Sequence, residues 1–133
     1  MDISLGHCFI TVHDADEALT FYRDALGLDV RNDVATEAGR WVTLSPPSQP
    51  DVEIVLSTPQ SGRSPADSDA LLELLTKGSL PGVLFRTSDL DTTFEKVRAS
   101  GAEVLQEPTD RFWGAKDCAF RDPSGNMVRI SQA

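Results

Sequence analysis

The pattern of apolar and polar residues predicts strands and one helix in the first half of the chain. In residues 7–13, uniformly apolar side chains alternate with a mixed set of polar and aromatic side chains, which is typical of a strand with one buried face. Asp14 then begins a helix in which apolar residues recur at helical spacing, and Gly27 stands where such a helix ends. The other predicted strands of this half are 29–32, 40–45 and 52–56. The order is therefore β-α-β-β-β.

The same order of elements begins again in the second half. A strand at 83–87 leads to a helix that Asp89 begins and Gly101 ends, one residue shorter than its counterpart. The other predicted strands of this half are 102–106, 116–121 and 126–131. A repeat of this size indicates two supersecondary units that bury their helices against sheets. We predict one α+β domain over 1–133, with βαβββ modules at 1–58 and 81–133 and a linker with a short helix at 59–80.

Composition and charge narrow the classes of function. The 133 residues are 40% hydrophobic and 25% charged, as in an ordinary soluble domain, and their net charge is −9. No apolar stretch approaches the ~20 residues that span a bilayer, and the N-terminus lacks the features of a signal peptide. We therefore expect a cytoplasmic protein without a membrane partner. The absence of a Lys/Arg cluster argues against nucleic acid as a partner.

Two stretches carry a resemblance to a known family. The sequence from His7 to Leu28 resembles the opening of the vicinal oxygen chelate superfamily, and that from Phe120 to Asn126 resembles its last hairpin. This superfamily contains glyoxalases, bleomycin-resistance proteins and extradiol dioxygenases. The resemblance covers essentially the whole chain. It implies a glyoxalase-like fold, in which two βαβββ modules form a combined, partly open sheet cavity, and it implies a homodimer.

The resemblance also implies where a metal ion would be bound. Metalloenzymes of this superfamily hold a divalent ion with four ligands, usually His, Glu, His and Glu. The corresponding positions of this chain are His7, Val55, Gly82 and Arg129. Valine and glycine offer no donor and arginine is a permanent cation, so we expect no metal and no other cofactor. An alternative that stays open is a divalent metal held by His7 and Glu53.

Strand alternation predicts which side chains line the ligand cavity. The face that carries His7 mixes apolar and polar residues, as a small-molecule site requires. His7 and Glu53 are the candidate catalytic residues, as an acid–base pair. Arg129 is the candidate anion-binding group, with Glu53 as its expected partner. The candidate ligand-binding residues are Phe9, Trp41, Arg86, Phe112, Trp113, Met127 and Arg129.

Two functions remain open from the sequence. The first is a small-molecule-binding protein of the glyoxalase/bleomycin-resistance type with a degenerate metal site. The alternative is a lyase, isomerase or dioxygenase of the same superfamily that uses an unorthodox metal site or the His7/Glu53 pair. In either case the partner is a small organic ligand or substrate. We favour the binding protein because the metal ligands are lost and because Phe112 and Trp113 in one loop suit stacking on a planar ligand.

Overall fold

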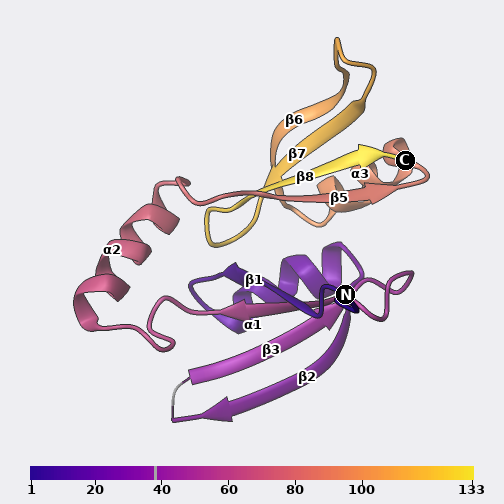
Figure 1. Cartoon of the computed structure of the whole chain (residues 1–133). Helices are drawn as coiled ribbons and strands as arrows, with labels where there is room; N and C mark the ends of the chain where they lie inside the picture. Colours follow the sequence, from indigo (N-terminus) through magenta and orange to yellow (C-terminus); the bar gives the residue numbers. More distant parts are fainter. Residues whose placement is uncertain (38) are drawn as a thin grey trace. The chain divides into compact units, whose positions relative to one another are not determined.

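The strands form two four-stranded mixed sheets in the computed structural model, which describes residues 1–37 and 39–133 (Figure 1). The first sheet has the order β1 (His7–Thr11), β4 (Glu53–Ser57), β3 (Gly39–Ser45) and β2 (Asp29–Thr36). The second has the order β5 (Val83–Thr87), β8 (Met127–Gln132), β7 (Lys116–Arg121) and β6 (Glu103–Asp110). In each order the first two strands are parallel and the other neighbours antiparallel. The repeated topology confirms the predicted α+β fold of two βαβββ modules.

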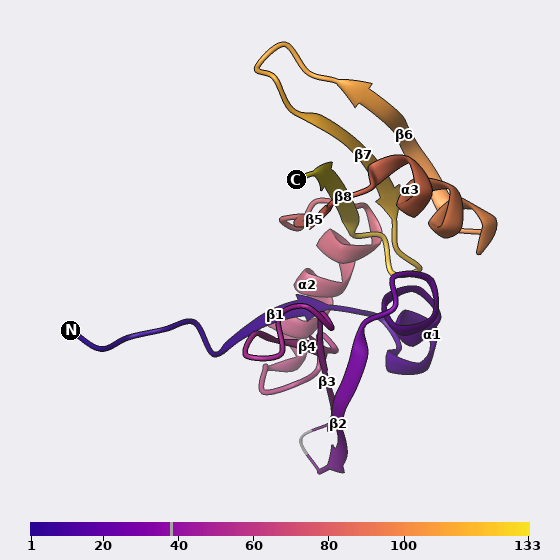
Figure 2. The ribbon, with the colours of Figure 1, turned by 90° about the vertical axis from the view of Figure 1, so that its right-hand side faces the viewer.

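Two strands are longer than the sequence pattern predicts. β2 continues to Thr36 and β6 to Asp110, whereas the pattern indicated strands that end at residues 32 and 106. Both strands lie at a sheet edge, and every residue of β2 is exposed. Because β2 has no buried face, its sequence shows no alternation of apolar and polar residues from which its length could be predicted. The residues of β6 do alternate between exposed and half-buried, but the pairing of this strand with β7 is irregular. In both ribbon views the β6–β7 hairpin continues past β8 (Figure 1, Figure 2).

The first helix contains a π-helical segment that the sequence pattern did not predict. α1 (Ala15–Leu19) begins at the predicted aspartate cap and continues into the π-helix η1 (Thr20–Ala25). Its counterpart in the second module, α3 (Leu90–Ala99), is α-helical throughout and one residue shorter between its cap and its terminal glycine. The widened turn, in which the Leu26 N–H donates to the Phe21 carbonyl, accommodates the extra residue.

Each module buries its apolar residues between its sheet and its helix. Large buried residues on the core face of the first module are Ile10, Val42, Leu44, Ile54 and Leu56 of the strands and Val12 directly after β1. Those of the second module are Cys118, Phe120, Val128 and Ile130. Val83 and Phe85, which the alternation assigned to the same buried face, are half-buried. In the second module Phe94 of α3 lies against Phe120 of β7, with 5.4 Å between the ring centroids.

The chain divides into two compact units, Met1–Glu73 and Leu74–Ala133. Each unit contains one of the two sheets, and the helix α2 (Pro65–Thr76) passes from the first unit into the second. Before β1, the N-terminal residues form an extended segment (Figure 2). Among the residues that the structure describes, no helix has the length and apolarity needed to cross a membrane.

Candidate functional site

The predicted site residues that belong to strands lie on the face of each sheet that is opposite its buried core. On β1, Ile10 is buried in the core, whereas His7 and Phe9 are exposed on the other face. On β8, Val128 is buried and Arg129 points to the other face. The predicted division of each sheet into an apolar face and a mixed face therefore describes both units.

The predicted acid–base pair is assembled on the first sheet. The parallel pairing of β1 with β4 sets His7 opposite Glu53, and His7 Nε2 lies 2.5 Å from Glu53 Oε2. The two side chains are 55% and 32% exposed, so both are accessible to a bound molecule. An imidazole in contact with a carboxylate is a workable proton-transfer pair. The catalytic role of the pair stays a prediction.

Two of the aromatic candidates contact one another on the same sheet. The ring centroids of Phe9 and Trp41 are 6.5 Å apart and the rings meet edge to face. Phe9 is exposed, although an aromatic side chain of this size is usually at least partly covered. The pair offers an apolar surface on the strand face that also carries His7, as the walls of a small-molecule site require.

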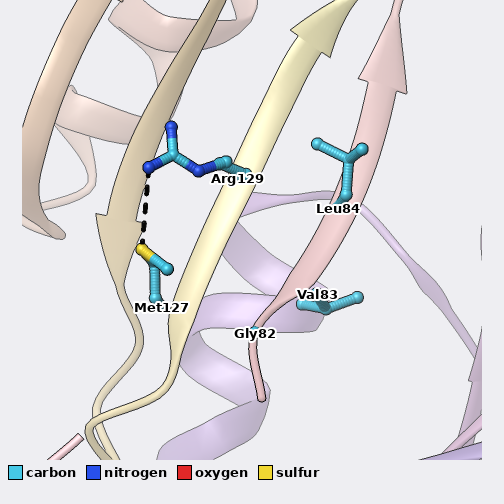
Figure 3. Close-up of a pocket in the computed structure, with 5 residues that line it drawn as sticks. All are labelled: Gly82, Val83, Leu84, Met127 and Arg129. Carbon is cyan, nitrogen blue, oxygen red and sulfur yellow. Dashed lines mark hydrogen bonds between the residues drawn. The ribbon is translucent and has the colours of Figure 1, made fainter.

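The second sheet carries a cavity of about 240 Å³ between β5 and β8 (Figure 3). Its lining residues are Gly82, Val83, Leu84, Met127 and Arg129. Four of these five are apolar, and Arg129 supplies the charged group. Figure 3 shows the sulfur of Met127 directed at the Arg129 guanidinium, 3.9 Å from Nη2. The structure therefore brings two predicted ligand-binding residues together at one cavity.

Arg129 is held by residues that the sequence analysis did not select. Its Nη1 lies 3.4 Å from Oδ2 of Asp117 on β7 and donates to Oε1 of Gln106 on β6 at 3.2 Å. Asp117 Oδ1 accepts hydrogen bonds from Arg111 Nε at 2.9 Å and from Gln106 Nε2 at 3.0 Å. Arg111 Nη2 in turn donates to Gln106 Oε1. We call these four side chains, Gln106, Arg111, Asp117 and Arg129, the arginine network.

The arginine network surrounds a buried carboxylate. The Asp117 side chain is only 8% exposed. Burial by itself would raise the pKa of Asp117, but the hydrogen bonds from Arg111 and Gln106 and the charges of the two arginines outweigh it and hold the pKa below its usual range. The carboxylate is therefore ionised at neutral pH, and the network carries one net positive charge.

One residue of the arginine network, Asp117, could have been recognised from the sequence. Asp117 is an acidic residue next to the apolar run Cys118–Phe120 of β7, in phase with the mixed face of the sheet. Gln106 had no such signal because an irregularity in the pairing of β6 with β7, on both sides of Gln106, determines which way this residue faces. Within the first unit Glu53 has the partner His7, and within the second unit Arg129 has the partner Asp117. The expected pairing of Arg129 with Glu53 would join the two units and stays a prediction.

The remaining candidates lie at the surface of the second unit. Phe112 and Trp113 are 97% and 60% exposed in the loop between β6 and β7, with their rings edge to face. Arg111 lies over the Trp113 ring, 5.5 Å from its centroid, so this loop connects to the arginine network. Arg86 is exposed on β5, and its side chain has no hydrogen bond or ion pair within the part of the chain that the structure describes. Their roles in ligand binding stay predictions.

The residues at the expected metal positions do not fit a divalent ion. In the first module Phe9 lies opposite Val55, and in the second module Leu84 lies opposite Arg129. Because Phe9 and Leu84 are equivalent positions of the two modules, Arg129 is the equivalent of Val55. Neither side chain is a metal donor, and a Cβ on Gly82 would lie 2.8 Å from the Met127 carbonyl oxygen. Within residues 1–37 and 39–133, no group of three or more His, Cys, Asp or Glu side chains is arranged to hold a metal.

The fold and these sites define a two-module α+β protein whose second sheet presents an anchored arginine instead of a metal ligand. The family model described as "Glyoxalase/Bleomycin resistance protein/Dioxygenase superfamily" matches residues 4–130. The chain belongs to this superfamily, as its first and last motifs indicated. A relative from Bacillus subtilis (strain 168), the uncharacterized protein YurT, is 31% identical over 92% of this chain and 94% of its own.

Two solved structures are similar over nearly the whole chain. UcmS2 is 31% identical, with a TM-score of 0.90 and complete coverage of both chains. TnmS3, described as an antibiotic binding protein from Streptomyces sp. CB03234, is 28% identical, with a TM-score of 0.78 over 99% of this chain and 98% of its own. One structural neighbour of this protein is thus described as an antibiotic binding protein.

Proposed function

We propose that this protein binds a small organic molecule without a metal ion. The observation that carries the proposal is the replacement of the metal ligands in the second module, where Arg129 stands on an apolar cavity and is anchored by Asp117. Apolar walls with one oriented polar group are characteristic of a small-molecule site. The description of TnmS3 as an antibiotic binding protein supports the same class of ligand.

A thermal-shift screen of the full chain in the presence of EDTA tests this proposal. The compounds are a panel of structurally diverse antibiotics that includes bleomycin. A compound that binds only the folded state raises the melting temperature, by an amount that grows with its concentration relative to Kd. We expect at least one compound to raise the melting temperature in a saturable way, with binding confirmed by calorimetry. A panel without such a compound, or binding that requires an added divalent ion, would contradict the proposal.

A second candidate function is proton transfer, which the contact between His7 Nε2 and Glu53 Oε2 favours. In this case the protein would move a proton at a carbon next to a carbonyl group of its ligand, with the imidazole as the base and the carboxylate orienting it. Incubation of each compound from the screen in D₂O, followed by NMR, would show exchange of that hydrogen. We expect the exchange to be lost in His7→Gln and kept in the wild type; equal exchange in both would remove this candidate.

The expectations of a homodimer and of a cytoplasmic location stay predictions. Light scattering coupled to size-exclusion chromatography of the full chain measures the first directly.

A further inference from the structure

One edge of the Arg129 guanidinium is free for a ligand. A guanidinium carries five N–H donors, and the contacts with Asp117 and Gln106 both involve Nη1. The edge formed by Nε and Nη2 has no oxygen partner within the part of the chain that the structure describes, and Nη2 has only the Met127 sulfur nearby. A thioether is a weak acceptor on a flexible side chain, so a stronger acceptor readily displaces it.

The same chain shows what this edge of an arginine binds. Arg40 uses its Nε and Nη2 to hold the two oxygens of Asp33, at 2.9 and 2.8 Å. This bidentate arrangement is the strongest and most directional contact between an arginine and a carboxylate. The Nε–Nη2 edge of Arg129 is therefore suited to a carboxylate that the chain itself does not supply.

The arginine network prepares Arg129 for such a contact. Asp117 and Gln106 fix the position of Nη1, so little side-chain entropy remains to be lost when a ligand binds. With Arg111 the network keeps one net positive charge, in a chain whose total charge is −9. A local positive charge on an acidic protein attracts an anion to this place and leaves the rest of the surface unattractive to it.

The walls of the cavity determine the rest of the ligand. Leu84 and Met127 present apolar surface, and no second charged residue lines the cavity. Its volume of about 240 Å³ is below the range of about 300–1,000 Å³ that is typical for whole drug-sized ligands. The cavity therefore suits one acidic group together with a small apolar part, such as one or two rings.

We propose that the cavity between β5 and β8 binds the carboxylate of an organic ligand on the Nε–Nη2 edge of Arg129. The apolar body of the ligand lies against Leu84 and Met127. This inference rests on the proposed function, which it deepens by naming an aromatic or aliphatic carboxylate as the ligand class.

The test uses naphthalene-2-carboxylate and its neutral counterpart naphthalene-2-carboxamide, titrated into the ¹⁵N-labelled full chain in the presence of EDTA. The NMR signal of the Arg129 Nε–H group reports directly on the proposed contact. We expect the acid to shift this signal in a saturable way and to bind about tenfold to a hundredfold more tightly than the amide, as a charge-assisted hydrogen-bonded pair provides. The Arg98 Nε–H signal, from the exposed Glu95 pair on α3, should not move.

Three variants make the test specific. Arg129→Met removes the charge and should abolish the preference for the acid over the amide. Arg129→Lys keeps the charge beside Asp117 but lacks the planar edge, so its preference should be intermediate. Arg98→Met, which removes the same charge from a helix outside the cavity, should bind the acid like the wild type.

The outcomes separate this inference from the proposed function. Equal binding of acid and amide, or unchanged acid binding in Arg129→Met, overturns the carboxylate site. Absence of binding by either compound, when an antibiotic from the screen does bind, overturns the carboxylate site and leaves the proposed function standing. If neither these compounds nor the screen give a ligand, both proposals fail.

Discussion

The carboxylate of Asp117 determines the position of the charged side chains around it on the second sheet. Asp117 is almost completely buried, yet it is ionised because Arg111, Gln106 and Arg129 all approach it. A buried charge is tolerated only when it is paired and hydrogen-bonded, and here every oxygen of the carboxylate has a partner. The position of Arg129 at the cavity therefore depends on Asp117, which itself contacts no ligand in the proposed site.

Replacement of Asp117 should destabilise the protein in a pH-dependent way. Asp117→Ala leaves two arginines without their shared partner, and we expect it to lower the free energy of unfolding by about 1–3 kcal/mol at neutral pH. Because the pKa of Asp117 is lower in the folded than in the unfolded state, this contribution is complete above the ordinary aspartate pKa. It is lost as the pH falls through the lowered value, where the folded carboxylate is protonated.

Urea denaturation of both proteins between pH 2 and 7 measures this difference, with the pH values chosen about the range of aspartate titration. Asp91→Ala is the matched control, since Asp91 forms an exposed ion pair with Lys116 and should contribute about 0–1 kcal/mol. A difference between Asp117→Ala and the wild type that grows as the pH falls would contradict the assigned pairing.

The secondary-structure elements show two ways in which the repeated modules differ. The first helix accommodates one extra residue in the π-helical η1, whereas α3 stays α-helical. The first strands differ at the position that the metalloenzymes use for histidine: β1 carries His7 there, and the chain before β5 carries Gly82. At Gly82 the backbone approaches β8 so closely that an added Cβ would lie 2.8 Å from the Met127 carbonyl oxygen.

Gly82→Ala should therefore destabilise the β5–β8 pair. Its Cβ meets backbone, which moves less readily than a flexible side chain, and overpacking of this kind costs about 1–3 kcal/mol. Chemical denaturation measures the loss. Gly6→Ala is the control, because a Cβ at Gly6 meets no atom within 4 Å, and its effect should stay within about 0.5 kcal/mol. Equal stabilities of the two variants would show that β5 shifts freely against β8.

The two units have the same topology, but each carries a different set of candidate functional residues. The unit Met1–Glu73 carries the His7–Glu53 pair, and the unit Leu74–Ala133 carries the cavity and the arginine network. The identical register of β1 with β4 and of β5 with β8 shows that the difference lies in the side chains and not in the fold. The prediction that His7, Glu53, Arg86 and Arg129 share one surface spans both units and stays a prediction.

Removal of divalent metal should leave the stability of this protein unchanged. A metal bound to the folded state adds to stability by mass action, and its removal would lower the melting temperature. Since the donors at the metal positions are replaced, we expect the same melting temperature before and after treatment with EDTA. Differential scanning calorimetry of protein purified without chelator is the measurement. A decrease in melting temperature that one particular divalent ion reverses would support the alternative metal site at His7 and Glu53.

The sequence by itself determined the elements and their repetition. Capping aspartates, terminal glycines and two-residue alternation are local signals, and each reflects a backbone or burial requirement within a few neighbouring residues. They sufficed to predict two βαβββ modules, and both the family and the fold are confirmed. The loss of the metal ligands is what the family resemblance implies. The edge strands β2 and β6 were predicted too short: β2 has no buried face that imposes alternation, and β6 pairs irregularly with β7.

The partners of the site residues were decided by the tertiary structure. Sequence alternation placed Arg129 on the mixed face of its sheet but did not identify Asp117 and Gln106 as its partners there. The antiparallel register of β7 with β8 and the irregular pairing of β6 bring Asp117 and Gln106 to Arg129. Such contacts depend on strand order and register between residues up to 23 positions apart in the chain, and no local pattern in the sequence encodes them.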